Sequence, residues 1–305
     1  MSEATSSIAV GVFDGLHLGH REILGRMLAR AHAGGRRAVV VSFDPHPDVV
    51  LARSFQAPAP LTPHAERRAM LEAMGVDTYE VLPFTRELAA LEPEEFVDRH
   101  LVQPFAMRDL VVGANFALGR GRSGDIPRLT RIGEARGFEV EPVPLFELDG
   151  APVSSTRIRG LLAEGRVDLA ARQLGRRYAL RGTVVTGDGL GRRLGVPTAN
   201  LRLHEEKLLP ADGIYAARAR LAGEDAWRAA AMSIGMRPTF GEQPRTLEVH
   251  LLDWSGELVG RELAGELESW VRGQVKFESP AALAAAMQDD LRLVRDRLAT
   301  SSAKA

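Results

Sequence analysis

Apolar residues in the first 175 positions follow two alternating patterns. Short continuous apolar runs predict buried strands, and apolar residues that recur about every three to four positions predict amphipathic helices. The expected strands are Ile8–Val12, Ala38–Ser42, Thr78–Leu82, Leu110–Val112 and Glu139–Val143. The expected helices are Arg21–Ala33, Pro63–Met74, Pro93–Val102, Gly124–Arg136, Ser155–Glu164 and Val167–Leu174, with Thr62 as the N-cap before Pro63. Strands that alternate with helices favour a parallel sheet with helices on both faces.

The pattern changes after Gly175, where a short polar bridge leads into β-like segments separated by glycine-rich turns. The expected strands there are Leu180–Thr186, Gly213–Arg220, Trp227–Ser233 and Leu247–Asp253, followed by a helix at Pro280–Leu298. Several strands closed by one helix favour a small antiparallel barrel. We therefore expect an α/β chain with a Rossmann-like domain at residues 1–175, a linker at 176–180, a barrel domain at 181–300 and a tail at 301–305.

Composition narrows the possible functions. The chain has 305 residues and a formal net charge of −1, so its charge balance does not predict binding to nucleic acid. It has no cysteine, which excludes a disulfide, a thiolate nucleophile and a cysteine metal site. No leader pattern and no membrane-spanning run is present in the sequence. These features favour a cytoplasmic enzyme that does not act at a membrane.

The most informative stretch, G-V-F-D-G-L-H-L-G-H at 11–20, follows the first expected strand and leads into the first helix. A helix N-terminus offers unpaired N–H groups and a partial positive charge, which attract phosphate. His17 and His20 are three positions apart, so we expect both on one face in the first helical turn. Two imidazoles there could hold and polarise a nucleoside triphosphate, which favours nucleotidyl transfer. The alternative is a pair of surface histidines on an ordinary helix.

Further motifs occur in both halves of the chain. They are F-D-P-H-P at 43–47, V-G-A-N-F-A-L-G at 112–119, S-S-T-R-I-R at 154–159, the glycine-rich stretch at 182–192, G-V-P-T-A-N at 195–200, S-I-G-M-R-P-T-F at 233–240 and L-E-V-H at 247–250. Together with the first motif they resemble the bifunctional riboflavin kinase/FMN adenylyltransferases, the prokaryotic FAD synthetases. The resemblance extends from about Ile8 to Leu298.

For the first domain the resemblance implies a nucleotidyltransferase that adenylylates FMN with ATP to give FAD and pyrophosphate. It assigns His17 and His20 to the ATP triphosphate as catalytic residues. The other implied nucleotide- and flavin-binding residues are Gly11, Phe13, Asp14, Gly15, Asp44, His46, Asn115, Ser155, Thr156 and Arg159. Ala117 and Leu118 stand where the family commonly has Arg and Phe. Arg120 and Arg122 either compensate for these changes or are solvated loop charges.

For the second domain the resemblance implies a riboflavin kinase that makes FMN from riboflavin and ATP. Glu248 is the expected catalytic base for the 5′-hydroxyl of riboflavin, since that hydroxyl is a poor nucleophile until it loses a proton. The implied nucleotide- and flavin-binding residues are Gly187, Gly189, Gly191, Gly195, Pro197, Thr198 and Asn200. Thr198 and Asn200 also offer oxygen ligands for Mg²⁺. The segment 233–240 is expected to form a flap near the flavin.

The expected partners are therefore riboflavin, FMN and ATP, with Mg²⁺ as cofactor and no nucleic acid. Two alternatives remain open from the sequence. Only the kinase could be active, because Ala117 and Leu118 alter the first site. The chain could also be a flavin-binding regulator without turnover, although flavin binding alone requires no residues for a triphosphate.

Overall fold

The computed structural model describes residues 5–51, 59–235 and 245–302. The chain forms two compact units, Met1–Ser155 and Thr156–Ala305. The division falls after Ser155, the first residue of α8 (Ser155–Ala163). The rest of α8 and all of α9 (Val167–Leu174), which we assigned to the first domain, are therefore counted with the second unit. The predicted domain limits of 1–175 and 181–300 stay a prediction.

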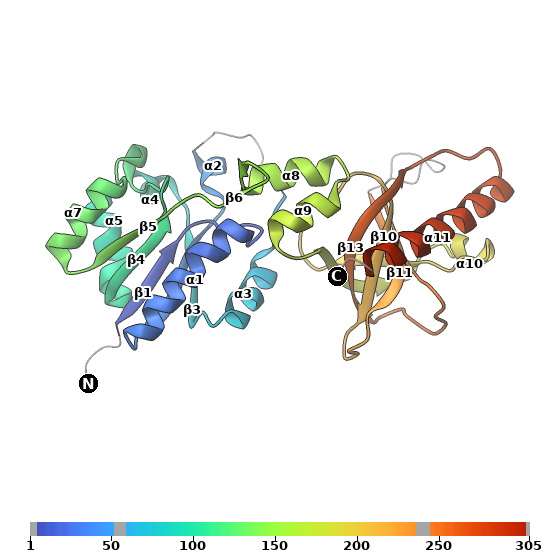
Figure 1. Cartoon of the computed structure of the whole chain (residues 1–305), viewed down its shortest axis with the longest axis horizontal. Helices are drawn as coiled ribbons and strands as arrows, with labels where there is room; N and C mark the ends of the chain where they lie inside the picture. Colours follow the sequence, from blue (N-terminus) through green and yellow to red (C-terminus); the bar gives the residue numbers. More distant parts are fainter. Residues whose placement is uncertain (1–4, 52–58, 236–244, 303–305) are drawn as a thin grey trace. The chain divides into compact units, whose positions relative to one another are not determined.

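A five-stranded parallel sheet forms the centre of the first unit (Figure 1). Its order is β3-β2-β1-β4-β5. The strands are β1 (Ser6–Val10), β2 (Arg37–Asp44), β3 (Thr78–Pro83), β4 (Met107–Gly113) and β5 (Glu139–Val143). All five expected strands are present, which confirms the predicted parallel sheet.

Helices cover both faces of this sheet, so the side chains of its central strand are buried on both sides. Ile8 and Val10 of β1 belong to one apolar core and Ala9 belongs to the other. The main helices are α1 (Leu18–Ala33), α3 (His64–Ala73) and α7 (Ile126–Arg136). Shorter elements are α2 (Pro47–Val50), α4 (Arg86–Ala90), α5 (Pro93–Val97), the π-helix η1 (Asp98–Val102), α6 (Gln103–Phe105), the 3₁₀-helix η2 (Arg120–Arg122) and the hairpin of β6 (Glu147–Leu148) and β7 (Ala151–Pro152).

Two predicted helix starts are corrected. His17 lies outside α1 as its N-cap, in an extended conformation, and not in the first helical turn. Thr62 does not cap α3, whose N-cap is Pro63 without a side-chain hydrogen bond. The backbone N–H and C=O groups of Thr62 instead bind Asp14 and Arg67. A buried charge pair therefore holds the start of α3 in place of a local cap.

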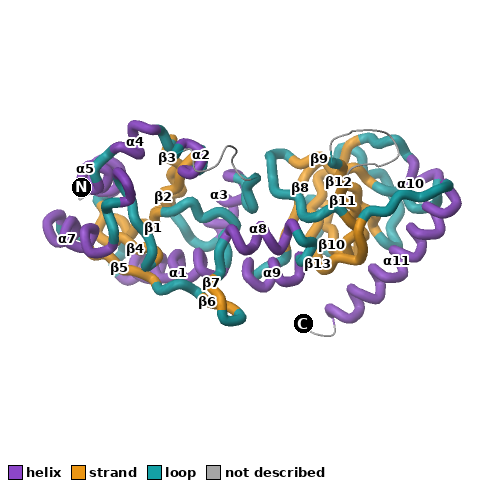
Figure 2. The backbone as a smooth tube through the Cα atoms, turned by 90° about the horizontal axis from the view of Figure 1, so that it is seen from above, coloured by secondary structure: helices purple, strands orange, loops and turns teal. Residues whose placement is uncertain are grey.

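The second unit is a closed antiparallel barrel in the order β10-β11-β12-β9-β8-β13. Its strands are β8 (Tyr178–Val185), β9 (Ala199–Leu203), β10 (Gly213–Leu221), β11 (Arg228–Gly235), β12 (Thr246–Leu251) and β13 (Glu262–Gly273). The short helix α10 (Leu190–Arg193) follows β8. The last helix, α11 (Pro280–Ser302), lies along the barrel strands and buries Val294 and Leu298 against them (Figure 2). The predicted barrel and terminal helix are confirmed, whereas β9 and β13 were missed.

None of the helices in the described ranges has the length and hydropathy needed to cross a membrane.

Candidate active sites

The strand order of the first unit determines where a ligand can bind. Connections run outward in both directions from β1 and β4, so the order reverses between these two neighbouring strands. In open parallel sheets, ligands bind at the carboxyl ends of the strands at such a reversal. The loops after β1, β2 and β4 contain the motifs at 11–20, 43–47 and 112–119. The fold therefore brings three sequence motifs to one edge.

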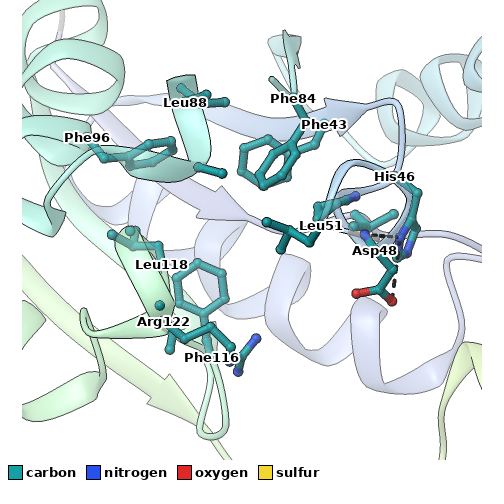
Figure 3. A pocket seen from close by; sticks show the side chains of 17 residues that line it. Phe43, His46, Asp48, Leu51, Phe84, Leu88, Phe96, Phe116, Leu118 and Arg122 are labelled. Carbon is teal, nitrogen blue, oxygen red and sulfur yellow. Dashed lines mark hydrogen bonds and ion pairs between the residues drawn. The ribbon is translucent and has the colours of Figure 1, made fainter. Parts of the chain in front are cut away.

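A cavity of about 380 Å³ lies at this edge and has an aromatic wall (Figure 3). Phe43, Phe84 and Phe96 form a cluster, with the Phe43 ring centroid 5.4 Å from that of Phe84 and 6.3 Å from that of Phe96. Phe116 and Leu118 also line the cavity. Its polar lining residues are His46, Asp48 and Arg122. An apolar wall with a few polar groups suits a planar aromatic ligand with a charged tail.

The turn after β1 is held in a conformation that most residues avoid. Phe13, Gly15 and Leu16 have φ values of 51°, 88° and 42°. Such left-handed conformations cost free energy for residues with a side chain and persist where the surroundings impose them. At Gly11, a Cβ would lie 3.2 Å from the Phe13 ring. This tight turn brings the chain from β1 directly into the N-cap of α1.

The carboxylate of Asp14 stabilises this turn and is almost fully buried. It accepts hydrogen bonds from the backbone N–H groups of Leu61, at 3.0 Å, and Thr62, at 2.9 Å. Arg67 donates to the same carboxylate at 3.3 Å. The Ser155 hydroxyl donates to the backbone oxygen of Asp14 at 2.8 Å. Asp14 and Ser155, both expected in the site, thus position its backbone.

His17 and His20 lie together as stacked rings, with centroids 3.6 Å apart and planes 17° apart. His17 Nδ1 accepts a hydrogen bond from the backbone N–H of His20 at 3.2 Å, so that nitrogen carries no proton in this arrangement. Burial lowers the pKa of His20 well below 6.5, and the neighbouring His17 and Arg67 lower it further. The neutral form of the His20 ring is therefore favoured in this arrangement.

The loops after β2 and β4 provide the next predicted residues. Asp44 is exposed, with its carboxylate oxygen 3.6 Å from His64 Nε2. His46 is the N-cap of α2, where its Nδ1 accepts from the backbone N–H of Asp48 at 3.2 Å. Asn115 is exposed in the loop after β4. Of these three residues, His46 lines the cavity.

Arg120 and Arg122 differ in their surroundings. Arg120 is 70% exposed and forms an ion pair with Glu92 at 2.5 Å. Arg122 lines the cavity and donates to the backbone oxygen of Asn115 at 3.1 Å. Arg122 has a φ of 60°, which directs the chain through a strained turn. The geometry thus favours Arg122, and not Arg120, as a cation for a ligand.

Thr156 and Arg159 follow Ser155 on α8 and are counted with the second unit. Thr156 is exposed and Arg159 is partly buried. Their part in the first site stays a prediction.

A second cavity, of about 390 Å³, lies in the barrel unit. Thr198, Asn200 and Glu248 all line it. Glu248 of β12 pairs directly with Asn200 of β9, and the Thr198 hydroxyl donates to the Glu248 carboxylate at 2.7 Å. Leu247 and Val249, on either side of Glu248, are buried in the barrel. Glu248 therefore lies on the outer face of its strand, but that face lines a cavity.

The glycines of this site make room for its polar side chains. A Cβ at Gly187 would lie 1.9 Å from Asn200 Nδ2, and one at Gly191 would lie 2.4 Å from the Val196 backbone oxygen. Gly189 and Gly195 have positive φ values of 66° and 80°. Gly189 and Gly191 line the cavity, and their part in ligand binding stays a prediction. The glycines thus serve both the tight turns and the packing around Asn200.

The opposite part of the same cavity is formed by β13, α11 and the segment that joins them. Arg272 and Asp290 form a two-fold ion pair of 2.7 and 2.6 Å there. The Arg272 guanidinium lies 5.7 Å from the Phe277 ring centroid. Apolar lining residues nearby are Val275, Leu283, Met287 and Leu291. Of the predicted flap, residues 236–240 lie outside the described residues, while Ser233 and Gly235 line the cavity.

Sequence reasoning missed several residues of these sites. His250 lines the second cavity, and its Nδ1 donates to the backbone oxygen of Pro197 at 2.7 Å. The signal was available, because residues two apart on a strand share a face and Glu248 was already assigned. Phe84 and Phe96 of the first cavity lie outside every motif, so only the fold reveals them.

A parallel-sheet nucleotide site and a barrel site with P-T-A-N together define a two-domain flavin nucleotide transferase. Residues 1–157 match the FAD synthetase family, and residues 174–298 match the riboflavin kinase family. The chain belongs to the family of bifunctional riboflavin kinase/FMN adenylyltransferases. A relative with that name from Pseudomonas fluorescens is 39% identical over 294 residues, which cover 96% of this chain and 93% of the relative.

Other relatives agree with this assignment. Proteins of the same name from Listeria monocytogenes and Escherichia coli are each 35% identical, over 93% and 95% of this chain and 89% and 91% of their own lengths. A solved structure from Streptococcus pneumoniae, described as a macrolide-efflux protein, has a TM-score of 0.86 and 28% identity over 95% of this chain and 94% of its own. That structure supports the fold.

Proposed function

We propose that the two reactions of this family take place at the two described sites, one in each unit. The chain phosphorylates riboflavin to FMN with ATP and adenylylates FMN to FAD with a second ATP. The strongest support for assigning one reaction to each site comes from the side chains that each site contains. The carboxylate of Glu248 lies beside the Thr198 hydroxyl in the barrel unit, whereas the first unit offers stacked imidazoles at a helix N-terminus.

Adenylyl transfer in the first unit needs alignment and charge neutralisation. A phosphate oxygen of FMN attacks the α-phosphorus of ATP, and the bond to pyrophosphate breaks. The FMN phosphate is already an anion, so no group has to remove a proton. His17, His20 and the N-terminus of α1 would balance the charge that develops on the triphosphate. The aromatic cavity with Phe43 and Phe116 would hold the flavin ring.

Phosphoryl transfer in the barrel unit needs a base. Glu248 would accept the proton of the riboflavin 5′-hydroxyl as its oxygen attacks the γ-phosphorus, and ADP leaves. Thr198 holds the Glu248 carboxylate by a hydrogen bond of 2.7 Å. The mostly apolar wall near α11 would receive the flavin ring, and the glycine-rich turn would receive the phosphates.

The barrel site also fits Mg²⁺. The Thr198 hydroxyl and the Asn200 amide are hard oxygen donors, and Gly187 leaves the space that the Asn200 side chain fills. Among the described residues no group of three His, Asp or Glu side chains is placed to bind a metal, so these neutral oxygens and the nucleotide phosphates would hold it. When bound, Mg²⁺ would neutralise phosphate charge during transfer. We also propose that the enzyme acts in the cytoplasm.

Incubation of the pure protein with riboflavin, ATP and Mg²⁺ tests this proposal. We expect FMN first and FAD later, both resolved by chromatography. FMN supplied in place of riboflavin should give FAD directly. If neither flavin nucleotide forms, the proposal is wrong. If FMN forms but FAD never does, the first site lacks the assigned activity.

A further inference from the structure

Arg67 is a buried cation beside the first site that no motif includes. It belongs to α3 and is 3% exposed. Its acidic partner is Asp14, at 3.3 Å. Burial of a guanidinium costs free energy unless its N–H groups are bound, so its position demands several acceptors.

Those acceptors lie at the ends of β1 and β2 and just before α3. Nη1 donates to the backbone oxygen of Val12 at 2.8 Å, just before the turn of the first motif. It also lies 3.5 Å from the hydroxyl of Ser42, which precedes the second motif and itself donates to Val12 at 3.2 Å. Nη2 donates to the backbone oxygen of Thr62 at 2.8 Å. One side chain thus joins the ends of β1 and β2 to the start of α3.

A second path leads from Arg67 to the loop after β2. Nη1 donates to the Tyr79 hydroxyl at 3.2 Å. That hydroxyl is 3.0 Å from His64 Nδ1, and His64 Nε2 is 3.6 Å from the Asp44 carboxylate. Asp14 and Asp44, one from each motif, are therefore both connected to the same guanidinium.

The charge of Arg67 also acts on His20, which we expect to bind the triphosphate. It lowers the pKa of His20, after the larger effect of burial and that of His17. A buried cation is poorly screened by solvent, so its field persists when the site is filled.

We propose that Arg67 is a positioning residue for adenylyl transfer, which holds the ends of β1 and β2, where the two motifs begin, against the start of α3 and contributes a fixed positive charge that acts on His20. This inference rests on the proposed function of the first site. It differs from a purely structural role because it requires the charge as well as the hydrogen bonds.

Two substitutions separate the charge from the hydrogen bonds. Arg67→Met removes both, and Arg67→Lys keeps the charge but loses the forked donors. We expect Arg67→Met to lower kcat/KM for FAD formation about 100-fold, because small misplacements of reacting groups have effects of that order. NMR titration should show a higher pKa for His20 in Arg67→Met. Arg67→Lys should lose less activity and keep the pKa of His20 near that of the unmodified protein.

The chain supplies its own controls. FMN formation from riboflavin in the same samples should not change, since Glu248 and its neighbours lie in the other unit. Arg131→Met is the matched variant, because Arg131 is an exposed arginine on helix α7 of the same unit. It should leave both activities unchanged.

Each other outcome contradicts the inference. Full FAD formation by Arg67→Met would overturn it. Equal losses in both Arg67 variants with an unchanged pKa for His20 would reduce Arg67 to a packing role. Loss of the folded His20 signal in both variants would make it a folding determinant only. An unmodified protein that forms no FAD would instead contradict the proposed function itself.

Discussion

At the scale of single residues, the contact between two imidazoles couples ligand binding to protonation. His17 and His20 stack at 3.6 Å, and the pKa of His20 lies well below 6.5 because of burial and two neighbouring groups. A bound triphosphate brings negative charge, which favours the protonated ring and raises that pKa. The ligand and the proton should therefore bind together.

We predict that ATP binding to the first site takes up a proton at pH values between the low pKa of His20 in the free protein and its higher pKa in the complex. The bound form holds more protons than the free form between the two pKa values of His20, so affinity for ATP should rise as pH falls through this window. Calorimetry in buffers of different ionisation enthalpy measures the uptake. The calorimetry uses the Glu248→Gln variant, so that the kinase of the other unit does not consume ATP by phosphorylating riboflavin. Unchanged uptake in His20→Asn would refute the assignment to His20.

Arg122 should contribute to substrate affinity in the first site. It lines the cavity, whereas Arg120 does not line it and is paired with Glu92. We expect Arg122→Ala to raise the KM for FMN or ATP about tenfold, the effect of one lost charge-assisted hydrogen bond. Steady-state FAD formation measures this, with Arg120→Ala as the matched control. Equal effects of the two substitutions would contradict the distinction.

The sequence allowed residue predictions where a motif was present. His46, Thr198 and Glu248 line cavities, since loops after strands meet at one edge and strand residues alternate, while their roles stay predictions. Arg67 was not found, because the sequence shows it only as one of two adjacent arginines on a helix. Its spacing of four from the buried Leu71 was the available signal, as both fall on the core-facing side.

At the scale of elements, the strands that were missed have clear causes. β13 alternates glycine and glutamate with apolar residues, and Gly265 lies where a Cβ would be 2.5 Å from Met232 Sδ. Glycine weakens the strand pattern, yet close approach inside the barrel requires it. β9 begins within the P-T-A-N motif, whose loop character concealed the strand. The parallel sheet was easier to predict, because its strands β1, β2 and β4 contain continuous apolar runs.

The turn between β8 and α10 gives a prediction at the same scale. Gly187→Ala would place a Cβ 1.9 Å from Asn200 Nδ2, so the Asn200 side chain must move while the backbone need not. We expect slower FMN formation that needs a higher Mg²⁺ concentration to reach half of its maximal rate, because a displaced Asn200 binds the ion less well. The fold should be retained, and FAD formation from FMN should not change. The Mg²⁺ concentration dependence of both reactions measures this.

Gly160→Ala is the matched control for that substitution. Gly160 lies in α8, where an added Cβ would have no neighbouring atom within 4 Å, and alanine favours helices. A normal kinase in Gly187→Ala would show that the space around Asn200 has no catalytic importance.

At the scale of the whole molecule, two chemistries belong to two units with separate cores. The first unit has a parallel sheet with two apolar clusters, and the second has a closed barrel covered by α11. Each reaction then depends on its own residues. FMN, the product of the barrel site, is the substrate of the other site. When FMN is supplied, a defect in the barrel unit should leave FAD formation intact, and a defect in the first unit should leave FMN formation intact.

The most direct measurement compares His20→Ala and Glu248→Gln in both half-reactions. His20→Ala should form FMN from riboflavin at the normal rate and lose FAD formation from FMN about 100-fold, since it lacks a group that balances developing charge. Glu248→Gln should lose FMN formation at least about 100-fold, since it lacks the base, and should convert supplied FMN to FAD normally. Equal loss of both activities in either variant would contradict the assignment of the two reactions to two separate sites.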